Sequence, residues 1–125
     1  MIDHVSVGVT DLAKATVFYE AVLATLGSQK LMEHAGTVGF GKNYPEFWLN
    51  HRPGLAATKE DNGCHICLRA PSVDAVDEFY ALAMSLGASS SGAPGLRPEY
   101  HESYYACFIR DADDNHFEVV TFVAG

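Results

Sequence analysis

The sequence is poor in basic residues and in long hydrophobic runs, and each scarcity excludes a class of protein. Eight Lys and Arg stand against sixteen Asp and Glu, which gives a formal net charge of −8. Such a chain is a poor match for nucleic acid or an anionic membrane surface. No stretch approaches the roughly 18 consecutive apolar residues of a membrane span, and the N-terminus lacks the basic region and apolar run of a signal peptide. We therefore expect a soluble, cytoplasmic protein.

Cysteine is also scarce, and the three present provide no disulfide framework. Cys64 and Cys67 form a C-x-x-C pattern. Positions i and i+3 of a strand point to opposite faces, however, so these thiols would not chelate one ion there. A second cysteine pair, needed to complete a zinc site, is also missing. We expect buried, reduced cysteines in the core.

A strand and helix pattern occurs twice in the chain. The two copies keep the same register with one gap of one residue, and the matching pairs are His4 with His65, Phe18-Tyr19 with Phe79-Tyr80, and Leu26-Gly27 with Leu86-Gly87. A length of 125 residues and a hydrophobic content of 48% suffice for one compact domain or two fused modules. The repeat therefore predicts a duplicated structural unit.

Each copy opens with a histidine on a strand whose side chains alternate between two faces. In the first copy Val5, Val7 and Val9 share the face expected to pack under a helix, whereas His4 shares the other with Ile2, Ser6 and Gly8. In the second copy Ile66, Leu68 and Ala70 take the place of the valines, opposite His65, Cys67 and Arg69. Both histidines should therefore point away from the helix-packed core.

The pattern predicts two β-α-β-β-β modules. Module 1 spans about residues 1–51, a polar linker about 52–63, and module 2 about 64–125. The first helix is expected from Asp11 to Leu26 with Gly27 as its stop, and its buried stripe comprises Leu12, Ala15, Tyr19, Val22 and Leu26. The second begins behind Ser72, with Val73, Val76, Tyr80, Ala83 and Leu86 as its buried stripe. The expected strands that follow are Gln29 to His34, Thr37 to Gly41, Glu46 to Asn50, Tyr104 to Arg110 and His116 to Val123.

Two segments of the second half have weaker patterns. Residues 89–95 are rich in Ser, Gly and Pro and should hold only a short edge strand. Residues 96–103 read as a polar loop. Asp111, Asp113 and Asn115 imitate the start of a calcium loop, but His116 and Phe122 stand where such a loop needs Gly and Glu. We interpret that segment as a tight hairpin turn.

Glu118 stands on the apolar last strand, on the face of His116, Val120 and Phe122. A carboxylate there should be paired, exposed or bound to a cation, because an unpaired buried charge is very unfavourable. Together with His4 and His65, it makes a possible two-histidine, one-carboxylate metal site with open coordination positions. Taken singly, a strand histidine is more often a hydrogen-bonded structural residue than a ligand, and Glu118 could be a solvent-facing edge residue.

The whole chain resembles the vicinal oxygen chelate superfamily of glyoxalases, extradiol dioxygenases, fosfomycin-resistance thiol transferases and bleomycin-resistance proteins. The resemblance rests on the paired modules, the D-H-V-x-x-x-V opening, the H-x-x-L strand and the final D-x-D-x-N-x-x-E-V run. It implies a single α+β domain in which two β-α-β-β-β modules form a curled, cup-like mixed sheet with the helices outside. It also implies a homodimer, with modules paired within one chain or exchanged between two.

The resemblance places the metal ligands at His4, His65 and Glu118 and implies a divalent cofactor, Fe(II), Mn(II), Zn(II) or Ni(II). A fourth ligand of glyoxalase I type would be Glu46, one pleat out of place, or is missing. The expected function is then a metal-dependent dioxygenase, lyase, isomerase or thiol transferase acting on a small oxygen-bearing substrate. The alternative is a metal-free protein that sequesters a small molecule or drug.

Other residues are candidates for substrate binding or proton transfer. Trp48 could stack on a ligand or belong to the core. Arg69 and Arg97 could bind a carboxylate or phosphonate, or simply be solvated. Tyr100, His101 and Tyr105 could form a lid or act as acid and base, or lie in a solvated loop. His34 and His51 are expected at the surface.

Overall fold

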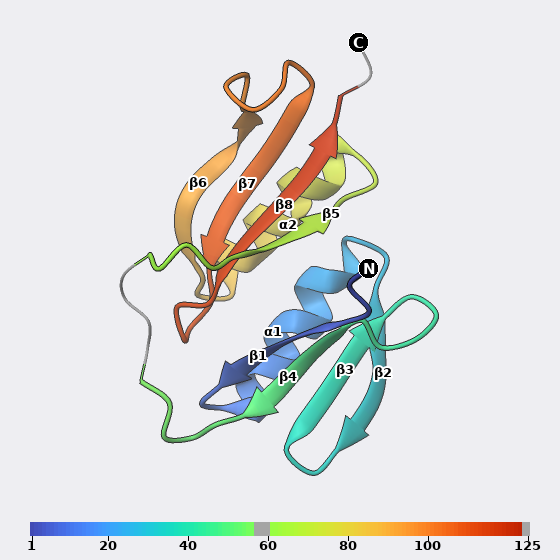
Figure 1. Ribbon diagram of the computed structural model, residues 1–125, viewed down its shortest axis with the longest axis vertical. Helices are drawn as coiled ribbons and strands as arrows, with labels where there is room; N and C mark the ends of the chain where they lie inside the picture. Colours follow the sequence, from blue (N-terminus) through green and yellow to red (C-terminus); the bar gives the residue numbers. More distant parts are fainter. Residues whose placement is uncertain (57–60, 124–125) are drawn as a thin grey trace. The chain divides into compact units, whose positions relative to one another are not determined.

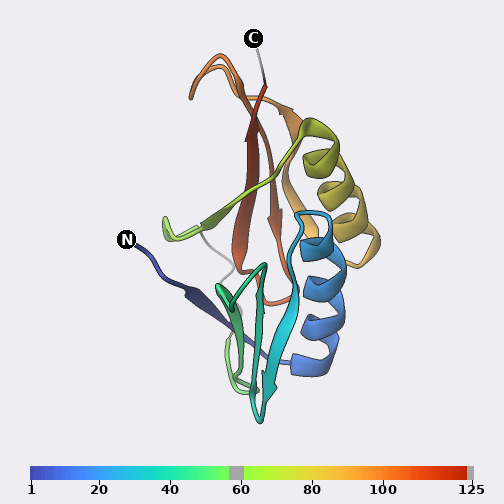
Figure 2. The ribbon, with the colours of Figure 1, turned by 90° about the vertical axis from the view of Figure 1, so that its right-hand side faces the viewer.

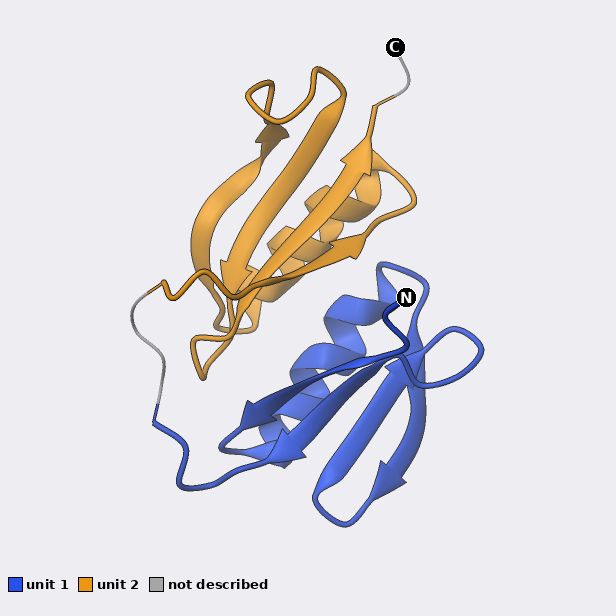
Figure 3. Ribbon diagram, in the orientation of Figure 1, with its two compact units in different colours: residues 1–57 blue, residues 58–125 orange. Residues whose placement is uncertain are grey.

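The computed structural model describes residues 1–56 and 61–123, and the chain divides into two compact units, residues 1–57 and 58–125 (Figures 1 and 3). Part of the predicted linker and the last two residues lie outside the described residues. The first unit consists of β1 (Val5–Val9), α1 (Leu12–Ala24), β2 (Gln29–His34), β3 (Thr37–Gly41) and β4 (Phe47–His51). The second consists of β5 (Ile66–Arg69), α2 (Val73–Ser85), β6 (Ser89–Leu96), β7 (Tyr104–Arg110) and β8 (His116–Phe122). The predicted α+β class with two β-α-β-β-β modules is confirmed.

Each unit forms a four-stranded mixed sheet with the same topology. The strand orders are β1-β4-β3-β2 and β5-β8-β7-β6 (Figure 1). The first and last strands of each unit are parallel neighbours, and the other pairs are antiparallel. This strand order positions the candidate site, because it makes β5 and β8, which are far apart in sequence, neighbours in the sheet.

Each helix lies against one face of its own sheet (Figure 2). Asp11 caps α1 by accepting a hydrogen bond from the Lys14 backbone N–H at 3.0 Å, and Ser72 caps α2 through the Ala75 N–H at 3.1 Å. Gly27 follows α1 with a φ of 84°, a conformation that glycine adopts without steric cost. Within the described residues, neither helix is long and apolar enough to cross a membrane.

The buried stripes of the helices differ in part from the prediction. In α1, Tyr19 and Val22 are buried as expected, whereas Leu12 and Ala15 are only half-buried. In α2, Phe79 is 1% exposed and Leu86 is 39% exposed, so the predicted stripe is wrong at Leu86. The spacing of apolar residues allowed two different buried faces of α2 that both contain Val76 and Ala83. The observed buried face includes Phe79, and Leu86 is the C-cap residue beyond the helix.

Strand β6 is longer than the predicted short edge strand. It spans eight residues despite its Gly and Pro content, and its pairing with β7 shifts register between Ser90 and Gly92 and again between Gly92 and Gly95. Such irregularities accommodate residues that regular pairing excludes, and an edge strand tolerates proline. Arg97 adds hydrogen bonds from its guanidinium to the carbonyls of Ala93 and Gly95, both at 2.8 Å.

The cysteines are free, as expected, but only Cys107 is buried. Cys64 and Cys67 are exposed, so their predicted burial is wrong. Cys67 lies on the face of the second sheet that α2 does not cover, which is why a residue type common in cores is accessible here.

The turn between β7 and β8 is the predicted tight hairpin. Asp114 has a φ of 61°, and the Asp111 carboxylate accepts hydrogen bonds from the backbone N–H groups of Asp113 and Asn115 at 2.9 and 2.8 Å. The Asp111 side chain therefore stabilises the turn through hydrogen bonds to the turn's backbone. This turn fixes the register of β8 and with it the position of Glu118.

Candidate metal centre

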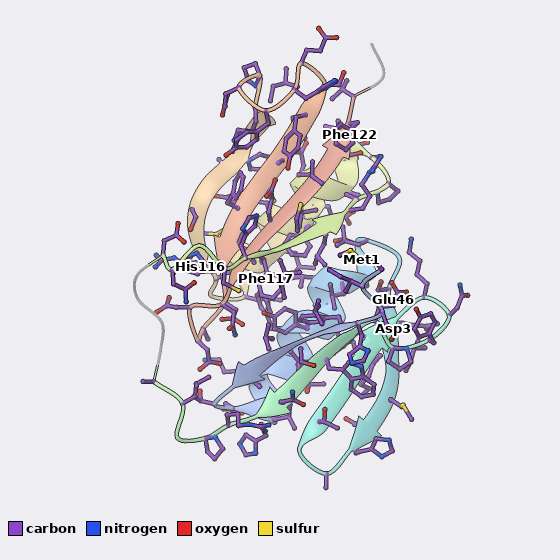
Figure 4. The ribbon with its side chains drawn as sticks, viewed as in Figure 1. Met1, Asp3, Glu46, His116, Phe117 and Phe122 are labelled. Atoms are coloured by element: carbon purple, nitrogen blue, oxygen red, sulfur yellow. The ribbon has the colours of Figure 1, made fainter. Side chains whose placement is uncertain are left out.

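The face of the second sheet opposite α2 carries the polar residues of the candidate site. The register pairs Cys67 of β5 with Glu118 of β8, and pairs Glu118 in turn with Phe108 of β7. His65 lies immediately before β5. Along β8, His116 and Phe122 lie at opposite ends of the strand (Figure 4), and Glu118 stands between them in the sequence of the strand.

His65 and Glu118 are in direct contact. His65 Nε2 lies 3.0 Å from Glu118 Oε1, and the side chains are 49% and 5% exposed, respectively. The carboxylate is thus buried but paired, which is one of the outcomes expected for a charge on so apolar a strand. The strand order explains the contact, since it places the N-terminal end of β5 beside β8.

Tyr104 of β7 provides the second partner of the carboxylate. Its hydroxyl donates a hydrogen bond to Glu118 Oε2. Burial of the hydroxyl, and then this hydrogen bond, raise the pKa of Tyr104 above its ordinary value. Tyr104 therefore stays protonated at neutral pH and acts as a fixed donor to Glu118.

Sequence reasoning chose Tyr105 of this tyrosine pair and passed over Tyr104. Strand alternation separates the two tyrosines, and the register of β7 against β8 assigns Tyr104 to the face of Glu118, because Tyr104 shares a face with Phe108, the partner of Glu118. Tyr105 lies on the opposite, helix-covered face, where its hydroxyl donates a hydrogen bond to Asp77 Oδ1 of α2 at 2.6 Å. The structure therefore does not bring Tyr105 together with Glu118.

Cys67 lies beside the carboxylate as its strand partner. Although its side chain is solvent accessible, the protein atoms around the thiol, and then the charge of Glu118, raise the pKa of Cys67 to about 12; a hydrogen bond with Tyr104 acts in the opposite direction. The group is therefore a neutral thiol at physiological pH and adds no negative charge to the site.

An aromatic group borders the Glu118 carboxylate and consists of Tyr100, His101, Tyr104 and Phe122. The ring of Tyr104 makes edge contacts with the rings of Tyr100 and Phe122, at centroid distances of 5.2 and 5.4 Å. The imidazole of His101 lies 6.2 Å from the ring of Phe122, and its Nδ1 accepts a hydrogen bond from the Ser103 N–H at 3.0 Å. Of the predicted proton-transfer candidates, Tyr100 thus packs against Tyr104, and His101 packs against Phe122.

The two candidate anion-binding arginines differ in what they contact. The Arg69 guanidinium lies over the Phe122 ring, 4.7 Å from its centroid, at the border of this aromatic group. The Arg97 guanidinium is bonded to the β6 carbonyls and lies 5.4 Å from the Phe108 ring centroid. Arg69 is therefore the arginine whose charged group is less committed to the backbone.

The first unit carries the remaining candidates. His4 Nδ1 lies 2.8 Å from Asp3 Oδ1, and both side chains are largely exposed. Glu46 is exposed and precedes β4, at the same end of the first sheet as Asp3 (Figure 4). The half-buried Trp48 packs across the sheet face opposite the buried Phe47, directly over Gly39. His34 and His51 are exposed, as predicted.

The contact between His65 and Glu118 fits a pair of metal ligands. Adjacent nitrogen and oxygen ligands that each lie about 2.1 Å from an octahedral ion are about 3 Å apart, which agrees with the observed 3.0 Å. The same separation allows the two groups to share a proton when no ion is bound. Neither unit taken alone, over its described residues, gathers three or more His, Cys, Asp or Glu in a group that could hold a metal.

Comparison with solved structures supports this topology. A glyoxalase/bleomycin resistance protein from Albidiferax ferrireducens has 28% identity and a TM-score of 0.83, with 94% of this chain and 96% of that one covered. A mutant of the fosfomycin resistance protein FosX from Listeria monocytogenes, complexed with Mn(II) and a dihydroxypropylphosphonic acid, has 18% identity and a TM-score of 0.69 over 95% and 87% of the two chains. FosX from Mesorhizobium loti has 18% identity and a TM-score of 0.70 over 97% and 91%.

No curated protein sequence matches the chain significantly. A family model does match, over residues 1–119. Because that match includes both units and extends one residue past Glu118, the chain belongs to the Glyoxalase/Bleomycin resistance protein/Dioxygenase superfamily.

Proposed function

We propose that the protein is a metal-dependent enzyme of this superfamily that binds two neighbouring oxygens of a small substrate at a divalent ion. His65 and Glu118 would hold the ion, with His4, which matches His65 in the sequence repeat, as the third ligand. The observation that carries the proposal is the 3.0 Å contact between an imidazole nitrogen and a buried carboxylate. Two histidines and one carboxylate leave coordination positions for substrate.

The donor set is compatible with Fe(II), Mn(II), Zn(II) or Ni(II), and the FosX structure from Listeria monocytogenes contains Mn(II). The ion would supply Lewis-acid chemistry at the substrate oxygens. The chain's own residues would orient the substrate and handle protons. We assign anion binding to Arg69, which lies over Phe122, and proton transfer to Tyr100 or His101, which pack around Tyr104 and Phe122. Trp48 would contribute an aromatic surface from the first unit.

The test is metal analysis of protein purified anaerobically without chelator, then of protein dialysed against micromolar Mn(II). Near-stoichiometric metal is expected in the wild type. Glu118→Gln and His65→Ala each remove one ligand and should lose most of it. His34→Ala, which removes an exposed histidine of β2, is the matched control and should keep the wild-type content.

Absence of bound metal in the wild type under both conditions would contradict the proposal. The protein would then be a metal-free binding protein, and the contact between His65 and Glu118 would be a hydrogen bond within it. A screen of small aromatic and cationic ligands, followed through Trp48 fluorescence, would be the next measurement. Equal metal content in wild type and Glu118→Gln would show that the ion binds elsewhere.

A further inference from the structure

The two oxygens of the Glu118 carboxylate have different partners. Oε1 faces His65 Nε2 at 3.0 Å, whereas Oε2 accepts the hydrogen bond from the Tyr104 hydroxyl. The carboxylate is 5% exposed, so water has little access to either oxygen. The rotation of this carboxylate is therefore set by protein partners on both sides.

Tyr104 is itself held firmly. Its ring makes edge-on contacts with the rings of both Tyr100 and Phe122. Its backbone carbonyl accepts a hydrogen bond from the Arg97 N–H at 2.7 Å, and its N–H donates to the His101 carbonyl at 3.1 Å. The position of the hydroxyl is thus determined by packing and backbone contacts that involve neither His65 nor Glu118.

We propose that Tyr104 is a positioning residue that makes Glu118 a one-oxygen metal ligand, by occupying Oε2 and leaving Oε1 directed towards the ion beside His65. This inference rests on the proposed metal-dependent function. A carboxylate that binds through both oxygens takes two coordination positions, and one that binds through a single oxygen takes one. On an octahedral ion with His4, His65 and Glu118 as ligands, Tyr104 thereby leaves three positions open instead of two, which accommodates two neighbouring substrate oxygens and one further ligand.

Outer partners of metal ligands have measurable effects. A hydrogen bond to a ligating carboxylate orients it, and its removal typically weakens metal binding by about 10–100-fold. Tyr104→Phe removes only the hydroxyl and keeps the ring that contacts Tyr100 and Phe122. The change should therefore act on Glu118 without loosening the aromatic group.

The experiment compares Tyr104→Phe with the wild type and with Tyr80→Phe. The control removes a hydroxyl that donates one hydrogen bond to Ser90 Oγ at 2.8 Å, on the opposite side of the same unit from Glu118. Mn(II) affinity is measured by calorimetry, and the coordination of Co(II) by its visible absorption spectrum. Thermal unfolding of each metal-free protein reports any purely structural effect.

We expect Tyr104→Phe to raise the Kd for Mn(II) by about 10–100-fold, because the carboxylate loses the hydrogen bond that orients it. The Co(II) spectrum should also change, because the freed Oε2 can join Oε1 on the ion. Tyr80→Phe should retain the wild-type Kd and spectrum. A Tyr104→Met variant, which lacks the hydroxyl but fills the space differently, gives a second reading if Tyr104→Phe unfolds.

The two proposals fail in different ways. Wild-type protein that binds neither Mn(II) nor Co(II) would contradict the metal-dependent function itself. Wild-type binding together with an unchanged Kd and spectrum in either folded Tyr104 variant would overturn the role of Tyr104 alone.

Discussion

Tyr105 and Asp77 form a hydrogen bond that joins β7 to α2, and its effect on stability should depend on pH. The hydrogen bond to Asp77, and then burial, raise the pKa of Tyr105 to about 12. An unfolded tyrosine ionises near pH 10. Between about pH 10 and 12 the unfolded chain therefore releases a proton that the folded protein retains, so stability falls as pH rises through this window. Below pH 10 this contribution is fully present.

The measurement is urea unfolding at several pH values between 9 and 11.5 for wild type and Tyr105→Phe, about the window given by the two pKa values. We expect the variant to lose less stability over the window, because it has no proton to lose at this position. Tyr80→Phe removes another hydroxyl of the same unit and should keep the wild-type slope. Identical slopes for wild type and Tyr105→Phe would show that Tyr105 ionises as in the unfolded chain.

Gly41, at the end of β3, is a position where no other residue fits. A Cβ atom built there would lie 1.9 Å from the backbone carbonyl oxygen of Tyr44, and this turn is closed by the hydrogen bond from the Glu46 N–H to the Phe40 carbonyl at 2.8 Å. Gly41→Ala must therefore move backbone and should cost at least about 2 kcal/mol of unfolding free energy.

Gly54 is the matched control, since a Cβ there would meet nothing within 4 Å. Gly54→Ala should change stability by no more than about 0.5 kcal/mol. Chemical denaturation of the two variants measures both values. Equal stability of Gly41→Ala and Gly54→Ala would mean that the turn after β3 relaxes freely.

At the scale of elements, regular periodicity predicted most of the fold, and tertiary contacts account for the exceptions. Alternation on β1 and β5 gave the correct helix-covered faces, and the helix starts predicted at Asp11 and behind Ser72 agree with the observed caps. The predicted length of the β6 strand was wrong because its Ser, Gly and Pro residues have low strand propensity. Its extended conformation depends on pairing with β7 and on hydrogen bonds from the Arg97 side chain to Ala93 and Gly95, and strand propensity accounts for neither.

Arg97 should therefore determine the local stability of β6. Arg97→Ala removes the hydrogen bonds to the Ala93 and Gly95 carbonyls and the contact with the Phe108 ring. We expect backbone amides of β6 to exchange with deuterium about tenfold faster in the variant, while those between β7 and β8 remain protected.

Arg52→Ala provides the comparison, because the side chain of the exposed Arg52 donates a hydrogen bond to the carbonyl of the adjacent His51. This variant should exchange like the wild type throughout β6. Unchanged protection of β6 in Arg97→Ala would show that pairing with β7 alone maintains the strand.

At the scale of the molecule, the candidate site was predictable only to the extent that the repeat implied topology. Placing the first and last strands of each module side by side brings His65 to Glu118, and the two side chains are in contact. Tyr104 was missed because both members of a tyrosine pair look alike in sequence until the register of β7 against β8 is known. His4 belongs to the other unit, so its part in the site depends on the whole chain and stays a prediction.

Metal-dependent stabilisation tests the part of His4. An ion that binds only the folded protein stabilises it by about 2.7 kcal/mol at a concentration of 100 times Kd, so Mn(II) should raise the Tm of the wild type. His4 is largely exposed and contacts Asp3, so His4→Ala should leave the metal-free protein almost unchanged in stability. If His4 is the third ligand, the variant loses most of the Mn(II)-induced rise in Tm, as Glu118→Gln does, while His34→Ala keeps it. If Mn(II) raises the Tm of His4→Ala as much as that of the wild type, metal binding is instead assigned to the second unit alone, with its two ligands completed by water or substrate.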